Sequence, residues 1–440
     1  MMANEATANE GTASEGDGST KPIGKVCVVG LGYIGLPTAA TIATRGVEVV
    51  GVDVNDHVVE ELNAGRAHFA EPDLDMLLDA AVTTGQLRAV AEPEPADAFV
   101  IAVPTPFHDN KSADLSFVEA ATRAVAAVLK PNDLVILEST SPVGTTERMA
   151  GWIAEERSDL RAVQDPLGEG ANPLLVHLAY CPERILPGRM VFELVENDRI
   201  IGGMNEASAE RAAALYRLFV RGELLQTTAP LAELVKLAEN AYRDVNIAFA
   251  NELSVLCEGW GLDAWKAIGL ANRHPRVNIL QPGPGVGGHC IAVDPWFLIS
   301  AAPDATPLMR AARQVNDAKP DHVLEQVRRH MTGFERPVIA CLGLSYKPNV
   351  DDLRQSPALK IVEALAHEEA ELLVIDPHVR TLPPALANLD NLRQGNLGDV
   401  GSADIVLVLV AHKEFARLDP EIIEKRTTID AVGLRKGNAR

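Results

Sequence analysis

The segment with the clearest capacity for chemistry is 281–290, which reads Gln-Pro-Gly-Pro-Gly-Val-Gly-Gly-His-Cys and ends at Cys290. Its four glycines make the backbone pliable and leave room beside the sulfur for a substrate. A thiolate in such a place can add to an aldehyde, and the thiohemiacetal can then lose a hydride to give a thioester. The alternative is a packing turn with an incidental buried thiol, and the loop alone leaves both open. A metal site is disfavoured, because the adjacent His289 and Cys290 have no partner pair.

Covalent chemistry at Cys290 requires groups that stabilise an oxyanion and move a proton. Lys236 and Asn240 are four residues apart in a helical pattern and therefore share one face. Asp294 follows Cys290 by four residues, so it shares the site if a helix begins there. Taken alone, a lysine–asparagine pair at this spacing is more typical of a solvated helix face.

A second chemical motif, Gly-Leu-Gly-Tyr-Ile-Gly at 30–35, follows a β-branched run and precedes a helical pattern. Gly30 permits a tight turn, Gly32 lets the backbone approach a pyrophosphate, and Gly35 allows close helix–strand packing. Asp53 ends the second strand pattern 23 residues after Gly30. Its carboxylate can bind a ribose 2′-hydroxyl and repel a 2′-phosphate, which favours NAD over NADP. The alternative is a glycine turn followed by a chance acidic residue.

The strand and helix patterns that must position these residues predict an α/β fold. Short β-branched runs recur between helical stretches, a rhythm typical of parallel sheets, at 25–29, 47–52, 98–103, 134–138, 338–342, 372–375, 405–410 and 427–430. Between the two groups, 230–258 has apolar residues at three- and four-residue steps and no internal glycine, which predicts one helix of about thirty residues. We therefore expect two Rossmann-like doubly wound domains joined by a long central helix and a helical middle domain. A helix of this length usually links domains or forms a subunit interface, and Ala248 is expected at the middle of that interface.

Composition narrows the possible partners and the compartment. The 440 residues include 61 acidic and 40 basic side chains, a net charge of −21, which disfavours nucleic acid and anionic lipid as partners. No apolar run approaches the roughly 18 residues needed to cross a bilayer, and no early segment resembles a signal peptide, so we expect a cytoplasmic protein without membrane insertion. The five cysteines show neither a disulfide framework nor a CxxC motif. Three of them, Cys27, Cys257 and Cys341, lie in apolar patterns and are expected to be buried.

Together these motifs resemble the UDP-glucose/GDP-mannose dehydrogenase family from about Lys25 to the C-terminus. The resemblance rests on four motifs in the family's order: Gly-Val-Gly-Gly-His-Cys at 285–290, Val-Pro-Thr-Pro at 103–106, Glu-Ser-Thr at 138–140 and Leu-Val-Lys-Leu-Ala-Glu-Asn at 234–240. It implies an NAD-binding N-terminal domain, a central helix that forms a homodimer, and a C-terminal domain that binds the nucleotide diphosphate. With it we expect a disordered tail at 1–22, an NAD-binding domain at 23–226, a central dimerisation and catalytic-cysteine domain at 227–330, and a UDP-sugar-binding domain at 331–440.

The resemblance also implies roles for individual residues. Cys290 is the expected nucleophile, and Lys236 and Asn240 are expected to stabilise its oxyanion intermediates. Asp294 is expected to assist proton transfer through a water held by Thr140. Glu183 is the expected base in thioester hydrolysis, whereas the neighbouring Cys181 has no implied role and is expected to be structural.

The binding residues that the resemblance implies fall into two sets, with no metal ligand in either. The NAD-binding set is Gly30, Gly32, Tyr33, Ile34, Gly35, Asp53, Thr105, Thr140 and Arg354. The substrate-binding set is Glu183, Arg184, Lys236, Asn240, Arg276, Gly287 and Lys347. Within it, Arg276 is expected to reach the substrate of the partner subunit.

The sequence around the cysteine favours one sugar within the family. UDP-glucose enzymes usually carry Lys-Asp where this chain has Val293 and Asp294, and Phe where it has Arg184. The segment 282–297 instead resembles members that act on UDP-N-acetyl-D-mannosamine. The expected reaction is the NAD-dependent four-electron oxidation of its C6 alcohol to a carboxylate. UDP-N-acetylglucosamine and UDP-glucose are alternative substrates; a two-electron hydroxyacid dehydrogenase and a catalytically silent nucleotide-sugar sensor are alternatives outside this activity.

Overall fold

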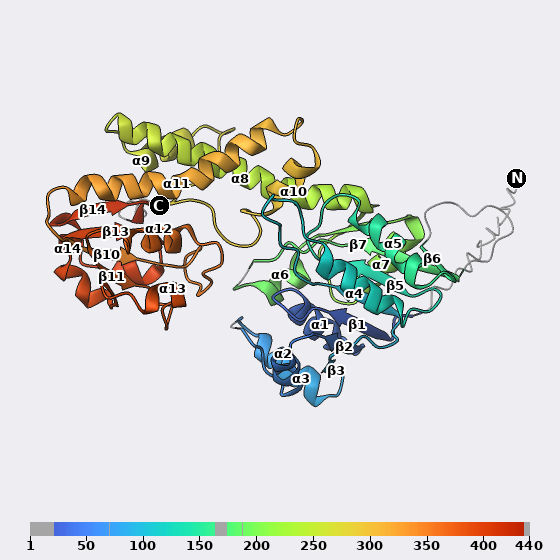
Figure 1. The fold of residues 1–440 in the computed structure, drawn as a ribbon. Helices are drawn as coiled ribbons and strands as arrows, with labels where there is room; N and C mark the ends of the chain where they lie inside the picture. The colour runs from blue at the N-terminus through green and yellow to red at the C-terminus, as the bar shows by residue number, and fades with distance from the viewer. Residues whose placement is uncertain (1–21, 70, 163–173, 187, 435–440) are drawn as a thin grey trace, which may run out of the picture. The chain divides into compact units, whose positions relative to one another are not determined.

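The computed structural model describes residues 22–69, 71–162, 174–186 and 188–434 (Figure 1). The chain divides into two compact units. The first comprises 1–103, 120–138 and 149–229, and the second comprises 104–119, 139–148 and 230–440. All but the last residue of the predicted N-terminal tail lies outside the described residues, and the domain limits predicted from the sequence stay predictions.

The first unit is built on a nine-stranded sheet. Its main order is β3-β2-β1-β4-β5-β7-β8-β9, with β6 paired to β7, and every pairing is parallel except that of β7 with β8. The strands are β1 (Lys25–Val29), β2 (Glu48–Val52), β3 (Leu87–Val90), β4 (Ala98–Ile101), β5 (Leu134–Leu137), β6 (Leu160–Ala162), β7 (Leu174–Tyr180), β8 (Arg199–Gly203) and β9 (Leu224–Thr228). The order 3-2-1-4-5 is that of a doubly wound dinucleotide-binding fold.

Helices connect these strands, as expected for parallel pairing. They are α1 (Gly35–Ala43), α2 (Asp56–Asn63), α3 (Leu74–Thr83), α4 (Ser116–Ala126), α5 (Thr145–Glu156), α6 (Met190–Glu196) and α7 (Glu206–Tyr216). Every residue of α1 is buried, because this helix packs directly on the sheet beside the glycine-rich turn. The first strand and its following helix therefore hold the turn from both sides.

The second unit contains a five-stranded parallel sheet in the order β12-β11-β10-β13-β14. Its strands are β10 (Val338–Leu342), β11 (Glu371–Ile375), β12 (Leu392–Gln394), β13 (Ile405–Val408) and β14 (Thr427–Asp430), and its helices are α12 (Pro357–Leu365), α13 (Pro384–Ala387) and α14 (Pro420–Glu424). Leu372 and Val374 pack into one core cluster and Leu373 and Ile375 into another, so the sheet is buried on both faces. Chain order and spatial order match those of β1 to β5, which confirms the prediction of two Rossmann-like folds.

The remaining helices of the second unit are α8 (Ala229–Gly259), α9 (Ala264–Ala271), α10 (Asp294–Ala301) and α11 (Pro307–Met331). The predicted long helix is confirmed, since α8 has 31 residues. The expectation for Ala248 is wrong: this side chain is 5% exposed and belongs to the core of its own chain. The outward side of α8 instead carries Tyr242, Phe249 and Leu256 at seven-residue steps. Within the described residues, no helix has the length and apolar character needed to cross a membrane.

Candidate active site

The turn between β1 and α1 has the geometry that a bound dinucleotide requires. Gly30 has φ +90°, and an added Cβ there would lie 2.6 Å from the carbonyl oxygen of Ala102. A Cβ at Gly35 would lie 1.8 Å from the Gly30 carbonyl oxygen, so only glycine permits this approach of helix to strand. Gly32 differs, because a Cβ there would meet no heavy atom within 4 Å. The backbone at Gly32 therefore borders open space, where a pyrophosphate can approach.

Asp53 lies directly after β2 and supports the same turn. Its Oδ2 accepts a hydrogen bond from the Leu31 amide at 2.9 Å, and its Oδ1 accepts one from the Asn55 amide at 2.9 Å. The carboxylate is only partly buried, and each oxygen keeps a lone pair that can accept from a ribose hydroxyl. Tyr33, in the turn, stacks on Phe69 with ring centroids 4.3 Å apart. These residues fit NAD, with Asp53 at the ribose and the 30–35 backbone at the pyrophosphate.

Two further predicted cofactor residues, Thr105 and Thr140, lie together in the second unit. The Thr105 hydroxyl donates to the Thr140 carbonyl oxygen at 2.6 Å. The segment after Thr140 is fixed by Glu233, a fully buried carboxylate on α8. Glu233 accepts from the Gly144 amide at 2.6 Å and from the amide and hydroxyl of Thr146 at 2.8 and 2.7 Å. The loop that contains Thr140 is thus attached to the helix that contains Lys236.

Close backbone packing holds the cysteine loop in place. A Cβ at Gly287 would lie 2.6 Å from the Gln355 carbonyl oxygen and 2.9 Å from Tyr346 Cβ. Gly288 has φ +83°, and its amide donates to the Arg354 carbonyl oxygen at 3.1 Å. Another residue type at Gly287 would displace the backbone at Gln355, and one at Gly288 would meet the Tyr346 ring in a left-handed conformation that favours glycine. The glycines of this loop therefore allow it to lie against the segment 346–355.

Cys290 leads directly into α10, as the spacing to Asp294 requires. The amides of Val293 and Asp294 donate to the Cys290 carbonyl oxygen at 2.9 and 2.8 Å, and α10 begins at Asp294. The other four cysteines are buried, but Cys290 is partly exposed, which contradicts the alternative of an incidental buried thiol. Burial of Cys27, Cys257 and Cys341 is confirmed, and Cys181 is buried as well.

Lys236, Asn240 and Asp294 form one buried group beside this cysteine segment. They are 7%, 9% and 2% exposed, so the alternative of a solvated helix face is wrong for Lys236 and Asn240. The Asn240 side-chain amide donates to Asp294 Oδ2 at 2.5 Å. Burial raises the pKa of Asp294 to about 6, although the Lys236 charge and the Asn240 hydrogen bond both lower it. A carboxyl with this pKa can exchange a proton near neutral pH.

The other predicted substrate residues lie in several segments. Lys347 lies in the second unit, as does Arg354, which was predicted to bind the cofactor. The Arg354 carbonyl oxygen accepts from the Gly288 amide of the cysteine loop, and its guanidinium pairs with Asp352 at 2.6 Å. Arg276 lies exposed after α9, in the same unit. Glu183 and Arg184 belong to the first unit, after β7, where the Arg184 guanidinium donates to the Asp198 carbonyl oxygen at 3.3 Å.

Several buried residues that support the site were not found from the sequence. Glu233 is three residues before Lys236 on the same helix face, and that spacing was the available signal. A second group links α8, α11 and the cysteine loop: Asn316 donates to Asp244 Oδ1 at 2.8 Å, Asn251 donates to Asn316 Oδ1 at 2.9 Å, and the Gly283 amide donates to Asn251 Oδ1 at 2.9 Å. Its members are distant in sequence and show no motif, so only the fold reveals them.

Comparison with known proteins agrees with this architecture. Three models of the UDP-glucose/GDP-mannose dehydrogenase family match consecutive parts of the chain: the NAD binding domain at 24–220, the central domain at 231–318 and the UDP binding domain at 340–435. The chain belongs to the UDP-glucose/GDP-mannose dehydrogenase family. As a member it is an NAD-dependent enzyme that oxidises a nucleotide sugar in a four-electron reaction, which confirms the predicted cofactor and reaction class.

Individual family members match over nearly their whole length. The NDP-N-acetyl-D-galactosaminuronic acid dehydrogenase of Ralstonia nicotianae is 56% identical over 410 residues, 93% of this chain and 96% of that protein. The UDP-N-acetyl-D-mannosamine dehydrogenase of Campylobacter jejuni is 54% identical over 400 residues, 90% of this chain and 97% of that protein. The solved UDP-D-ManNAc dehydrogenase of Pyrococcus horikoshii is similar with a TM-score of 0.83 and 39% identity, covering 93% and 96% of the two chains.

Proposed function

We propose that this enzyme oxidises the C6 alcohol of UDP-N-acetyl-D-mannosamine to the uronate through a thioester on Cys290. The observation that carries the mechanism is the buried group of Lys236, Asn240 and Asp294 beside the one partly exposed cysteine. Burial matters because an ammonium and an amide stabilise negative charge far more strongly where water is excluded. The same three side chains on a solvated face would supply little catalysis.

In the first oxidation, the C6 hydroxyl proton leaves through water to Asp294 as C6 becomes an aldehyde. Bound NAD supplies the hydride acceptor for each of the two oxidations. The Cys290 thiolate then adds to the aldehyde carbon, and the new alkoxide is held by the Lys236 ammonium and the Asn240 amide. Asn240 has a second N–H for this contact, because one N–H already donates to Asp294.

Loss of the second hydride from the thiohemiacetal gives a thioester on Cys290. Water attacks this thioester, Glu183 accepts a proton from the attacking water, and the thiolate leaves with the carboxylate as product. The role of Glu183 rests on its motif, Tyr-Cys-Pro-Glu-Arg at 180–184. The sum of the steps is two hydrides transferred for each sugar oxidised.

The substrate proposal rests on the cysteine segment 282–297 and on relatives. The Campylobacter jejuni and Pyrococcus horikoshii proteins named for N-acetylmannosamine cover nearly the full chain. A second candidate is the N-acetylgalactosamine nucleotide, because the Ralstonia nicotianae protein is named for the galactosaminuronic product and is 56% identical. Both candidates carry a 2-acetamido group and a primary C6 alcohol, and they differ in the configuration at C2 and C4.

Parallel assays decide between them. Purified enzyme with NAD is given UDP-N-acetylmannosamine, UDP-N-acetylgalactosamine, UDP-N-acetylglucosamine and UDP-glucose, and kcat/KM is compared. We expect the N-acetylmannosamine nucleotide to have the highest value and to yield two NADH per sugar. A higher value for the galacto sugar makes the second candidate correct, and one NADH per sugar without an acid product contradicts the thioester mechanism.

We also propose that the enzyme is a homodimer that forms through the outward side of α8. Tyr242, Phe249 and Leu256 are 68%, 57% and 44% exposed in the single chain, and Trp260 beyond the helix is 67% exposed. Their contact with a second copy removes this apolar surface from water. Arg276, also exposed, is proposed to complete the partner's substrate site.

A charge on this surface tests the dimer. Phe249→Glu is expected to give monomers and to reduce activity, because the partner's Arg276 is lost with the interface. Phe192→Glu on α6 is the matched control, since Phe192 is 55% exposed in the first unit. Size-exclusion chromatography with light scattering measures the mass. A Phe249→Glu protein that stays dimeric, or a fully active monomer, contradicts this arrangement.

A further inference from the structure

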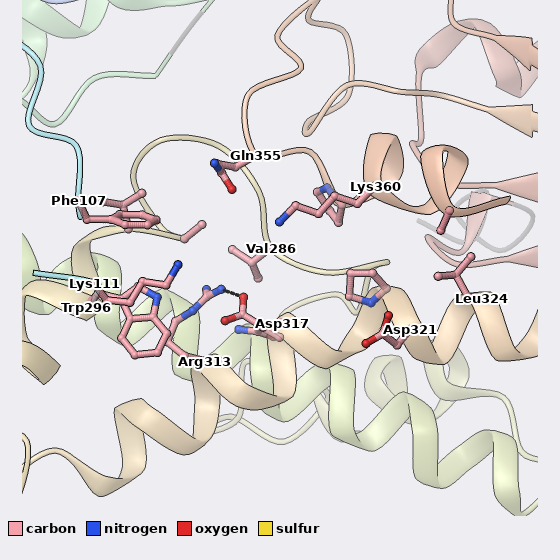
Figure 2. Close-up of a pocket in the computed structure, with 16 residues that line it drawn as sticks. Phe107, Lys111, Val286, Trp296, Arg313, Asp317, Asp321, Leu324, Gln355 and Lys360 are labelled. Atoms are coloured by element: carbon pink, nitrogen blue, oxygen red, sulfur yellow. Dashed lines mark hydrogen bonds and ion pairs between the residues drawn. The ribbon is translucent and has the colours of Figure 1, made fainter. Parts of the chain in front are cut away.

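A cavity of about 270 Å³ lies within the second unit, against part of the cysteine loop (Figure 2). Val286 of that loop, and Ala292 and Val293 shortly after it, form part of the cavity wall. The wall contains none of the five residues of this unit that are expected to take part in the reaction, Cys290, Lys236, Asn240, Asp294 and Thr140. The cavity is therefore a feature separate from the proposed reaction site.

Two lysines present their charge to this cavity, and neither forms an ion pair with another described residue. Figure 2 shows the ammonium groups of Lys111 and Lys360 directed toward the same space from different sides. The Lys111 ammonium lies 4.3 Å from the ring centroid of Phe107 and 5.9 Å from that of Trp296. Both rings attract the cation and hold it in place, but neither neutralises it. The lysine charges thus remain available to an anion.

A buried guanidinium adds a donor at the floor of the cavity. Arg313 on α11 is 1% exposed and lines the cavity (Figure 2). Its Nη1 donates to Asp244 Oδ1 at 2.6 Å and its Nη2 donates to Asp317, but its buried Nε has no hydrogen-bond partner among the residues that the structure describes. A buried donor without a partner costs free energy, which a ligand oxygen in the cavity would recover.

The N-terminus of α12 is the third positive feature. Gln355 and Pro357 line the cavity, and Ser356 between them is the N-cap of this nine-residue helix. The partial positive charge of a helix N-terminus favours phosphate groups. Two lysines, a guanidinium with a free N–H and a helix N-terminus therefore converge on one cavity.

The cavity also has acceptors, which restrict the ligand further. Asp317 and Asp321 line the side that α11 provides. A simple inorganic anion would be repelled by these carboxylates, whereas a ligand with hydroxyl groups can donate hydrogen bonds to them. The volume lies just below the usual 300–1,000 Å³ range of small-molecule sites, so it suits a ligand smaller than a UDP-sugar.

We propose that this cavity binds a small phosphate ester with hydroxyl groups, of the size of a sugar phosphate or a nucleoside monophosphate. Lys111, Lys360 and the α12 N-terminus hold the phosphate, and Arg313 Nε donates to a phosphate or ester oxygen. Asp317 and Asp321 accept from the hydroxyl groups. The site is independent of the proposed mechanism at Cys290, since no residue that lines the cavity takes part in that mechanism.

Isothermal titration calorimetry on the full chain tests the site with three probes: N-acetylglucosamine 1-phosphate, uridine 5′-monophosphate and inorganic phosphate. The Lys111→Ala/Lys360→Ala variant is expected to bind the preferred organic phosphate at least tenfold more weakly than wild type. Lys413→Ala is the control for loss of an exposed lysine, because its side chain is 70% exposed and lies outside the cavity. Lys347→Ala separates this site from the proposed UDP contact. Lys413→Ala is expected to keep the wild-type affinity for every probe, and Lys347→Ala is expected to keep the wild-type affinity for N-acetylglucosamine 1-phosphate.

Three outcomes overturn the proposal. One is that neither organic phosphate binds to the Lys347→Ala protein. Another is an affinity that the double lysine variant leaves unchanged. The third is inorganic phosphate binding as tightly as either ester, since the carboxylates would then contact no hydroxyl. Lys360→Ala alone, at an exposed position, provides a second variant if the double substitution disturbs folding.

Discussion

Gly30 in the first sheet and Gly343 in the second stand at the same corner of a Rossmann fold. Their φ angles are +90° and +95°. Each amide donates at 2.8 Å to the carbonyl oxygen of the last residue of the neighbouring strand, Val52 in the first unit and Ile375 in the second. In each unit the next amide donates to an aspartate carboxylate, at 2.9 Å for Asp53 and at 2.7 Å for Asp376. Strand order, turn and carboxylate are therefore repeated within one chain.

The two corners differ in what surrounds the carboxylate. Asp53 is partly exposed, and α1 begins five residues after Gly30. Asp376 is 7% exposed and also contacts His412 Nε2 at 3.2 Å. Because His412 Nδ1 accepts from the Asn349 amide, its Nε2 carries the proton and donates to Asp376. The same backbone corner is thus open to a ligand in one unit and closed by protein groups in the other.

Removing the Asp376 carboxylate of the second unit is expected to have the largest effect on the free energy of unfolding. Asp376 accepts hydrogen bonds from the amides of Leu344, Ser345, His378 and Val379 and from His412. Asp376→Ala leaves these donors buried without a partner, so unfolding free energy should fall by about 3–5 kcal/mol. Urea denaturation measures this loss. NAD affinity of the folded protein should be unchanged; a weaker NAD affinity at normal stability would show that the second corner also serves the cofactor.

The corresponding change in the first unit should affect binding instead of folding. Asp53→Asn replaces a charged acceptor by a neutral amide, so NAD affinity should fall about tenfold to a hundredfold, or about 1.5–3 kcal/mol. The loss of stability should stay near 1 kcal/mol, since the site is partly exposed. The preference for NAD over NADP should narrow, because the repulsion of a 2′-phosphate is lost. An unchanged preference, measured from kcat/KM for each cofactor, would contradict this placement of Asp53.

Asp294 is a third carboxylate, and its pKa is shifted in the opposite direction to that of Asp376. Burial raises the pKa of both Asp376 and Asp294, but hydrogen bonds from His412 and backbone amides bring the pKa of Asp376 below its ordinary 3.8. Asp294 has one Asn240 amide and the Lys236 charge as compensation, and its pKa stays raised at about 6. Asp376 therefore adds stability above pH 3.8 that is lost as pH falls through its lowered pKa. Asp294 has the opposite pH dependence. Its contribution to the free energy of unfolding is present below pH 3.8 and is lost as the pH rises through about 6.

Turnover should follow the ionisation of Asp294. The proposed proton transfer needs the carboxylate, so kcat/KM should fall about tenfold per pH unit below about 6. Asp294→Asn should lower activity at neutral pH and remove this acid limb. A pH–rate profile of the two proteins checks the assignment, and an acid limb that persists in Asp294→Asn would contradict it.

Much of this arrangement follows from local sequence, and the limits have physical causes. The β-branched runs locate β1, β10 and β14 to the residue, and apolar periodicity without an internal glycine locates α8 to within one residue at either end. The sequence did not reveal that His412 closes the second corner, because its contact with Asp376 joins residues 36 apart. Ala248 was misplaced because both sides of α8 are apolar, and periodicity alone does not distinguish the side facing its own core from the outward side. Asp244, Asn251 and Asn316 gave no signal for the same reason as His412: only tertiary packing brings them together.

The most direct test of the account is the steady-state turnover of Cys290→Ser with UDP-N-acetylmannosamine and NAD, followed by intact mass during the reaction. The hydroxyl is a weaker nucleophile than the thiolate, and an ester hydrolyses more slowly than a thioester. We therefore expect turnover to fall by roughly a thousandfold or more, with near-normal binding of both ligands and a slowly decaying covalent sugar adduct on the protein. Turnover near that of wild type, without an adduct, would show that Cys290 is a packing residue and that the thioester mechanism is wrong.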